Sequence, residues 1–268
     1  MTGEDGASRR AAMYGEDDLG SIEIFSGNFI NFGYWRDFER GAISVEERTT
    51  SQADLYRTVL GCLQIDRSDV VLEVGCGIAV GAALALREFE PRVIHGLDLS
   101  QDQLDRARSA NAGLLAERLP RLVLRQGSAL KIPYAEAMFD RCYSVEGAQH
   151  FEDLAAFAAE THRILKPGGR LAVTTFFTTH PTAVDELRPL LETVDNGIDV
   201  VLPIDSFLND LRVAGFTGAQ ADTIGDHVWP GLDAWIEQTE YKESWARNWL
   251  KAYHRGLVDY YLVTADKK

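Results

Sequence analysis

The residues best placed to do chemistry are two glycines and an aspartate that follow two apolar segments. Val70 to Val74 is an apolar run typical of a strand buried on both faces, and Gly75 and Gly77 come directly after it. Glycine lets the chain turn sharply and lets its backbone approach a ligand that a Cβ would obstruct. Asp98 ends the next apolar segment, roughly 20 residues later, where a carboxylate can accept hydrogen bonds from both ribose hydroxyls. This spacing predicts a site for a nucleotide-like cofactor.

Two helices must position these residues. The segment from 79 to 86 is mostly Ala and Leu, so a helix here can pack closely on a sheet while its N-terminal amides face the bound molecule. Ser100 and Gln103 have the spacing of a capping box at the start of the next helix. The glycines taken alone leave open a tight strand-to-helix turn that binds nothing, and Asp98 favours the binding site.

Composition narrows the class of protein. A chain of 268 residues suits one α/β domain with a small addition, and its formal net charge of −14 argues against binding nucleic acid or an anionic membrane surface. The three cysteines are isolated among apolar residues, which indicates reduced thiols in a cytoplasmic protein and no metal site. The polar, acidic N-terminus does not read as a secretory leader, and we expect no membrane insertion.

Apolar segments alternate with helical ones along the chain. This alternation predicts a doubly wound parallel sheet that binds ligands at the carboxyl ends of its strands. Residues 1 to about 20 are rich in Gly, Asp and Glu, and we expect them to be flexible. The expected strands are 70–74, 93–97, 122–125, 141–145 and 171–176, with a late pair at 216–224 and 257–264, and the expected helices include 52–63, 152–165 and 232–255.

Four motifs follow one another along the chain: Val71-Leu-Glu-Val-Gly-Cys-Gly77, Gly96-Leu-Asp-Leu-Ser100, Phe139-Asp140 and His162-Arg-Ile-Leu-Lys-Pro-Gly-Gly169. Through these motifs the chain resembles the class I S-adenosylmethionine-dependent methyltransferases, of the type that act on small natural products, sugars and lipids. The resemblance implies a seven-stranded Rossmann-like sheet whose last strand runs antiparallel beside the fifth, with a small helical cap and an N-terminal lid. It also implies S-adenosylmethionine as cofactor and S-adenosylhomocysteine as product, since nicotinamide dehydrogenases lack the Lys-Pro-Gly-Gly turn.

The same resemblance implies how the chain is organised. Residues 1–50 would form an N-terminal arm and aromatic lid, and residues 51–268 the methyltransferase domain, with an acceptor cap in an insertion at about 178–213. The lid is expected at Asn31-Phe-Gly-Tyr-Trp35, where aromatic faces could exclude water and contact a sulfonium. Packing without a binding role is the alternative for this segment and for the aromatic residues between 229 and 253.

Motif matching assigns roles at the cofactor site. Gly75 and Gly77 would lie under the methionine and ribose portions, Asp98 would hold the ribose hydroxyls, and Leu99 would lie against the adenine. Two positions depart from the family pattern: Ser128 stands where an aspartate is common, and Ala79 where a third glycine is frequent. The expected cofactor-binding residues are Tyr34, Glu73, Gly75, Gly77, Asp98, Leu99, Gln103, Ser128, Ala129 and Glu146.

The loop after the fourth strand holds the expected catalytic residues, His150 and Glu146. His150 matches a histidine of related O-methyltransferases, and its near-neutral pKa suits a general base. Thr174 and Thr175 stand where some relatives carry an acidic residue that supports the base, so His150 is expected to lack a carboxylate partner. The expected substrate pocket consists of Trp35, His150, Phe176 and Phe177.

These assignments predict O-methylation of a small, largely apolar acceptor in specialised metabolism. C-methylation or N-methylation of such an acceptor stays open, because a carbon nucleophile or a phenol needs less help from a base. A methyltransferase-like scaffold that catalyses another reaction or acts as a binding protein is a further alternative, as is a nicotinamide dehydrogenase. The sequence does not identify the acceptor, and it leaves a homo-oligomer open.

Overall fold

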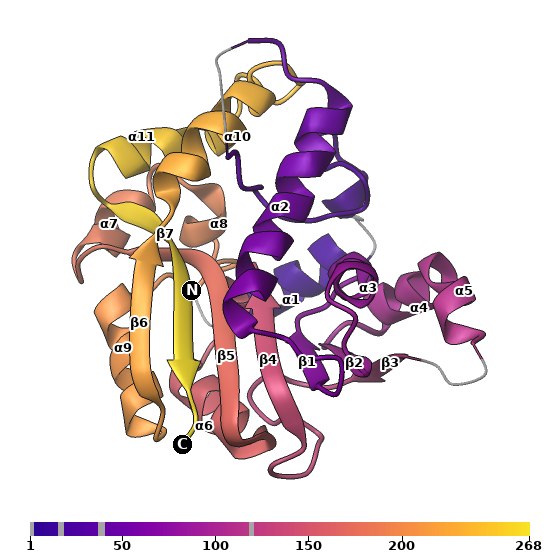
Figure 1. The fold of residues 1–268 in the computed structure, drawn as a ribbon. Helices are drawn as coiled ribbons and strands as arrows, with labels where there is room; N and C mark the ends of the chain where they lie inside the picture. The colour runs from indigo at the N-terminus through magenta and orange to yellow at the C-terminus, as the bar shows by residue number, and fades with distance from the viewer. Residues whose placement is uncertain (1–2, 16–18, 37–40, 118–120) are drawn as a thin grey trace.

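The computed structural model describes residues 3–15, 19–36, 41–117 and 121–268, and these residues form one seven-stranded sheet (Figure 1). The strand order is β3-β2-β1-β4-β5-β7-β6. Neighbours among β1 to β5 are parallel, and β7 lies antiparallel between β5 and β6. The predicted doubly wound sheet, with its last strand beside the fifth, is confirmed. The strands are β1 (Val70–Val74), β2 (Val93–Asp98), β3 (Leu122–Gln126), β4 (Phe139–Val145), β5 (Leu165–Thr178), β6 (Thr217–Thr223) and β7 (Val258–Asp266).

Helices cover both faces of the sheet, and each face has its own apolar cluster. Residues of α2, α3 and α4 contribute to one cluster, and residues of α6 and α9 to the other. Val71 of β1 joins the first cluster and Val70 and Leu72 join the second, as expected for a strand buried on both faces. The helices are α1 (Gly3–Tyr14), α2 (Val45–Leu63), α3 (Val80–Glu88), α4 (Gln101–Ala110), α5 (Ala112–Leu115), α6 (Leu154–Ile164), α7 (Ala183–Leu187), α8 (Glu192–Asp195), α9 (Ile204–Val213), α10 (Trp229–Ile236) and α11 (Asn248–His254).

Two helical regions differ from the prediction. Residues 3–14, expected to be flexible, form α1 because tertiary contacts described below hold them. The helix expected at 232–255 is two helices, α10 and α11. Within the described ranges, none of the helices combines the length and hydropathy that crossing a membrane requires.

Helix starts also differ in detail. Helix α2 begins at Val45 rather than 52, because Ser44 and Glu47 form a capping box there. The capping box expected at the start of α4 is half formed. Ser100 Oγ accepts a hydrogen bond from the Gln103 amide at 3.3 Å, but the Gln103 side chain reaches the carbonyl of Tyr14 instead, at 2.6 Å.

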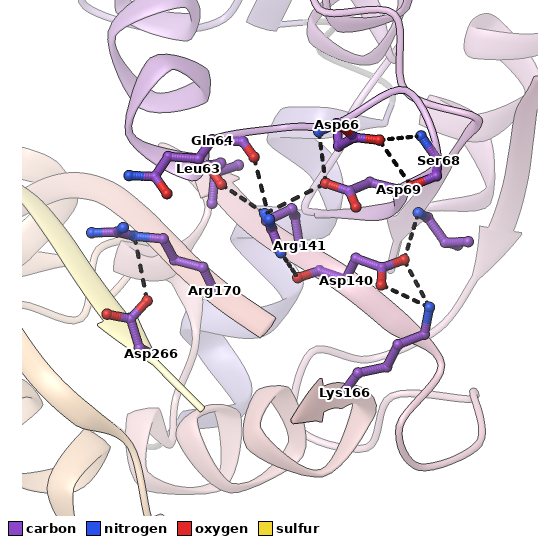
Figure 2. Close-up of polar contacts among 11 residues, drawn as sticks. Leu63, Gln64, Asp66, Ser68, Asp69, Asp140, Arg141, Lys166, Arg170 and Asp266 are labelled. Atoms are coloured by element: carbon purple, nitrogen blue, oxygen red, sulfur yellow. Dashed lines mark hydrogen bonds and ion pairs between the residues drawn. The ribbon is translucent and has the colours of Figure 1, made fainter. Parts of the chain in front are cut away.

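Paired charges hold the amino-terminal edge of the sheet, opposite the predicted site (Figure 2). Asp140 of β4 accepts a hydrogen bond from the amide of Val70 at 2.9 Å, which ties β4 to the start of β1. Lys166 Nζ lies 2.7 and 2.8 Å from the two Asp140 carboxylate oxygens. Burial alone would raise the pKa of Asp140, but Lys166 and the Val70 amide together hold it below its usual value.

We therefore expect Asp140→Asn to lower the free energy of unfolding by about 1 kcal/mol at pH 7, a value discounted for the partial exposure of the pair. The pKa of Asp140 is lower in the folded protein than in the unfolded chain, where it is about 4. The contribution of Asp140 to the free energy of unfolding is therefore fully present above the pKa of the unfolded chain, and it is lost as the pH falls through the pKa of the folded protein. Urea unfolding at pH 7 and at pH 3 measures both values. The exposed Asp185→Asn is the control, and an equal loss at both pH values would contradict the assignment.

Candidate functional site

A cavity of about 620 Å³ opens at the carboxyl ends of β1, β2 and β4, within the size range of small-molecule sites. Its walls come from α1, from residues 28–30, and from the segments that follow β1, β2, β3 and β4. Among the predicted residues, Gly75, Gly77, Asp98, Leu99, Gln103, Ser128, Ala129, Glu146 and His150 line it.

The glycine turn has the predicted form. Gly75 has φ of +76° and Gly77 has φ of +51°, the left-handed region that glycine adopts without strain. The amide of Gly77 donates to Asp98 Oδ2 at 2.8 Å, and the amide of Ser100 donates to Oδ1 at 2.9 Å. Asp98 thus orders the turn as well as facing the cavity. Ala79, where the family often has glycine, also has a positive φ, +58°.

The groups around Asp98 fit an adenosine cofactor. Burial raises the pKa of Asp98, while the backbone amides that it accepts from favour its ionised form. Leu99 is 71% exposed and lines the cavity, where it can cover an adenine ring. Gln103 Oε1 is buried without a hydrogen-bond partner in the described structure, so a donor on the cofactor can satisfy it. Ser128 Oγ accepts from the Leu130 amide at 3.1 Å within its own turn.

His150 lines the same cavity and has partners on both ring nitrogens. Nδ1 is 3.2 Å from the carbonyl oxygen of Ile198 and 3.4 Å from Asp199 Oδ1, and Nε2 is 2.7 Å from the hydroxyl of Tyr14. Since a carbonyl can only accept, we assign the ring proton to Nδ1, and Nε2 then accepts from Tyr14. Burial lowers the pKa of His150, and Asp199 opposes that shift. A buried neutral imidazole is the form that a general base requires.

The expectation that His150 lacks a carboxylate partner was wrong. Asp199 supplies the carboxylate from the irregular segment between α8 and α9, and it is 8% exposed. At the end of β5, Thr175 instead donates to Gln149 Oε1 at 2.7 Å. The Asn196-Gly197 pair indicates a turn near Asp199, but a turn motif does not show which side chain faces His150.

Glu146 connects the cavity to residues 29–35. Its Oε1 accepts from the amide of Phe32 at 2.6 Å and from the hydroxyl of Tyr260 at 2.7 Å. Burial raises the pKa of Glu146 to about 7, although these two hydrogen bonds and nearby Arg48 favour the charged form. Glu146 therefore positions the backbone of the aromatic segment and titrates near neutral pH.

This titration predicts a pH-dependent affinity for a cationic ligand. Arg48, Tyr260 and Asp199 lie near Glu146, and a cation in the cavity favours its carboxylate form. We expect S-adenosylmethionine to bind about 3- to 10-fold more tightly at pH 8 than at pH 6. Calorimetry should show a much smaller change with Glu146→Gln, and also with S-adenosylhomocysteine, which lacks the sulfonium charge. Equal pH dependence in the variant would contradict the role of Glu146.

Other predicted site residues lie outside the cavity lining, against the prediction. The Tyr34 ring packs 4.8 Å from that of His227. Trp35 Nε1 donates to the carbonyl of Phe32 at 3.2 Å, and its ring packs against Gly231 of α10. Tyr34 and Trp35 thus pack against other parts of the protein instead of lining the cavity.

Three strand residues are also set back from the cavity. Phe176 lies in an aromatic cluster, with its ring 4.4 Å from that of Trp249, and Phe177 stacks 5.4 Å from Phe207 on the other face of the sheet. Glu73 is fully buried, which raises its pKa to about 8. Alternation along a strand explains these positions, because neighbouring side chains point into opposite layers. The aromatic residues between 229 and 253 likewise pack in the core and do not line the cavity.

Helix α1 covers the site. Four of its residues line the cavity: Ala7, Arg10, Ala11 and Tyr14. The carbonyl of Tyr14 accepts hydrogen bonds from Gln103 and Arg106 of α4. The lid was predicted at residues 31–35, whereas the structure places α1 over the cavity, although the polar sequence of this helix had suggested flexibility. Of the described residues, none in the insertion at 178–213 lines the cavity, and the insertion supplies Asp199 behind His150 instead.

The sheet topology, the glycine turn after β1 and the acid at the end of β2 are the features that the resemblance to class I S-adenosylmethionine-dependent methyltransferases implied. The family model described as "Methyltransferase domain" matches residues 72–173. The protein is therefore an enzyme of this class that uses S-adenosylmethionine to methylate a small-molecule acceptor.

Individual relatives agree with this assignment. The chain is 29% identical to an erythromycin 3''-O-methyltransferase of Saccharopolyspora erythraea, over 92% of this chain and 81% of the relative. It is 26% identical to a 27-O-demethylrifamycin SV methyltransferase of Amycolatopsis mediterranei, over 80% of this chain and 75% of the relative. The fold is similar to that of geranyl diphosphate C-methyltransferase from Streptomyces coelicolor A3(2), with a TM-score of 0.81, 16% identity and 98% of both chains covered.

Proposed function

We propose that this enzyme methylates a hydroxyl oxygen of a small, largely apolar acceptor in specialised metabolism. The observation that carries the proposal is the neutral, partly buried His150, which lines the cavity: Nε2 lies 2.7 Å from the hydroxyl of Tyr14, another lining residue, while Nδ1 is backed by Ile198 and Asp199. An alcohol is a weak acid, so its oxygen needs a base when it attacks a methyl group. A carbon nucleophile such as an electron-rich alkene needs such a base less. The His150 arrangement therefore favours oxygen.

The proposed reaction is an in-line displacement. S-adenosylmethionine supplies a sulfonium methyl group: the acceptor oxygen bonds to the methyl carbon as the carbon–sulfur bond breaks and its electron pair stays on sulfur. His150 Nε2 receives the hydroxyl proton, and Asp199 and the Ile198 carbonyl stabilise the resulting imidazolium. The acceptor hydroxyl takes the place of the Tyr14 hydroxyl at Nε2, because the ring nitrogen has one lone pair. Positioning can lower the barrier by about 7–11 kcal/mol, and the base adds roughly 10²–10⁴ in rate.

The cavity supports an acceptor without strong negative charge. Among the described lining residues, Arg10 is the single lysine or arginine, and its charge is paired with that of Glu152. Asp98, Asp102 and Glu146 add negative charge to the lining. A diphosphate would meet net repulsion here, whereas a neutral polyketide, sugar or aromatic alcohol would not. The antibiotic-modifying names of the two relatives above agree with such an acceptor.

An acceptor panel tests this proposal. The protein is incubated with S-adenosylmethionine and, separately, 27-O-demethylrifamycin SV, other macrocyclic and aromatic alcohols, and geranyl diphosphate. We expect S-adenosylhomocysteine and a methyl ether from at least one alcohol, and no product from geranyl diphosphate. Methylation of carbon in geranyl diphosphate, with no alcohol accepted, would contradict O-methylation. His150→Ala is the matched control for base-dependent transfer.

A further inference from the structure

We propose that Arg10 is a positioning residue, carried on α1, that holds the backbone facing His150 and so fixes the ring in its base-competent form. The inference rests on the proposed role of His150. Arg10 Nη1 donates to the carbonyl of Gly197 at 2.9 Å and to that of Ile198 at 3.2 Å. Its Nη2 pairs with Glu152, immediately beyond the His150 loop. One guanidinium therefore joins the covering helix, the His150 loop and the Asp199 segment.

The carbonyl of Ile198 is the point where these contacts meet. It accepts from Arg10 Nη1 at 3.2 Å and faces His150 Nδ1 at 3.2 Å. The next residue is Asp199, whose Oδ1 is 3.4 Å from the same Nδ1. Both groups that favour a proton on Nδ1 are thus on adjacent residues, and Arg10 donates a hydrogen bond to the first of them, Ile198. Displacement of this backbone would remove the preference of the ring for one tautomer.

The backbone of residues 197–199 is held partly by α1 and partly by other segments. Asp199 and Val200 are fixed by backbone hydrogen bonds to Thr193 and Gln149, at 2.8 and 2.7 Å. Gly197 has φ of +77° and contacts α1 directly: a Cβ placed on Gly6 would lie 2.4 Å from the Gly197 oxygen. The helix and this segment are therefore packed backbone against backbone, and Arg10 supplies the side-chain hydrogen bonds across that contact.

A second arginine provides a matched comparison. Arg106 of α4 donates to the carbonyls of Tyr14 and Gly15, at 3.3 and 2.6 Å, and so holds the other end of α1. Neither of these two hydrogen bonds involves the Ile198 carbonyl. If Arg10 acts through that carbonyl, removing Arg10 should change the His150 ring, and removing Arg106 should loosen α1 without the same change.

The test measures the tautomer of the His150 ring directly and needs no methyl acceptor. Full-length protein with ¹⁵N-labelled histidine is saturated with S-adenosylhomocysteine, and the His150 nitrogens are assigned by their loss in His150→Gln. We expect the Nδ1–H tautomer in the wild type and in Arg106→Gln. In Arg10→Gln the ratio of Nδ1–H to Nε2–H should fall about tenfold, as for the loss of one hydrogen bond. Arg10→Lys, which keeps the charge but not the forked donor, should recover part of the ratio.

Two results would overturn the inference. One is a wild-type tautomer ratio in Arg10→Gln, and the other is an equal change in Arg10→Gln and Arg106→Gln, which would reflect a general loosening of α1. Arg108→Gln, which removes a charge paired with Asp105 on α4, controls for charge alone. Unchanged thermal unfolding midpoints show that the variants are folded. The turnover of His150→Ala tests the proposed function separately, because the tautomer measurement does not depend on methyl transfer.

Discussion

Replacing Asp98 by alanine should weaken the binding of S-adenosylmethionine by about 100-fold. The carboxylate would accept charge-assisted hydrogen bonds from the ribose, each worth about 1.5–3 kcal/mol in a buried site. It also accepts from the Gly77 amide at 2.8 Å, so its removal disorders the glycine turn that the cofactor contacts. Calorimetric titration of the purified variant with S-adenosylmethionine and S-adenosylhomocysteine measures the loss.

The control for this variant is Asp105→Asn on the exposed side of α4, which should leave the affinity unchanged. Asp98→Asn should fall between alanine and the wild type, because the amide keeps one acceptor oxygen for the turn. An Asp98→Ala protein that is folded and binds the cofactor with wild-type affinity would contradict the assignment of this site.

Replacing His150 by alanine should lower turnover by about 10²–10⁴-fold while the affinity for S-adenosylmethionine changes little. The reason is that His150 acts on the acceptor proton, whereas the cofactor is held by the glycine turn and Asp98. The measurement is kcat with an acceptor found in the panel, together with calorimetry of the same protein. Turnover equal to that of the wild type would remove His150 from the mechanism.

The pH profile tests the partner of His150. The neutral ring is the active form and burial holds the pKa of His150 below its usual 6.5, so turnover should fall only as the pH drops below that value. Asp199→Asn removes the charge that raises the pKa, so the fall should move to lower pH and the plateau should decrease by about 10-fold. Measuring both proteins in the Glu146→Gln background removes the nearby titration of Glu146. An unmoved profile would contradict the pairing.

The sequence predicted the features that depend on local pattern. Strands such as Val70–Val74 have an apolar pattern that predicts their burial. The glycines and Asp98 follow the ends of two strands, and this placement predicts that a ligand binds at the carboxyl edge of the sheet. His150 was found because it follows the fourth strand, whose carboxyl end meets the same edge, and because it matches a histidine of related O-methyltransferases. The inferences about the glycines and Asp98 need only the positions of residues relative to a strand or helix end, whereas the role of His150 also rests on the family resemblance.

The sequence did not show contacts between distant segments. Asp199 reaches His150 from an irregular stretch, and α1 is stabilised by Arg10, Gln103 and Arg106 rather than by an apolar stripe of its own. Local composition therefore predicted flexibility where tertiary hydrogen bonds make a helix. Trp35 is a type of residue expected to cover a ligand, but its ring is buried against Gly231, and this contact depends on the position of α10.

The most direct test of the account is to follow the methyl group itself. The protein is supplied with ¹³C-methyl S-adenosylmethionine and the alcohol accepted in the panel, and ¹³C NMR identifies the atom that carries the label. We predict a labelled methyl ether that forms with wild-type protein and is nearly absent with His150→Ala. Label on a carbon or nitrogen atom, or a labelled ether formed equally fast without His150, would contradict base-assisted O-methylation.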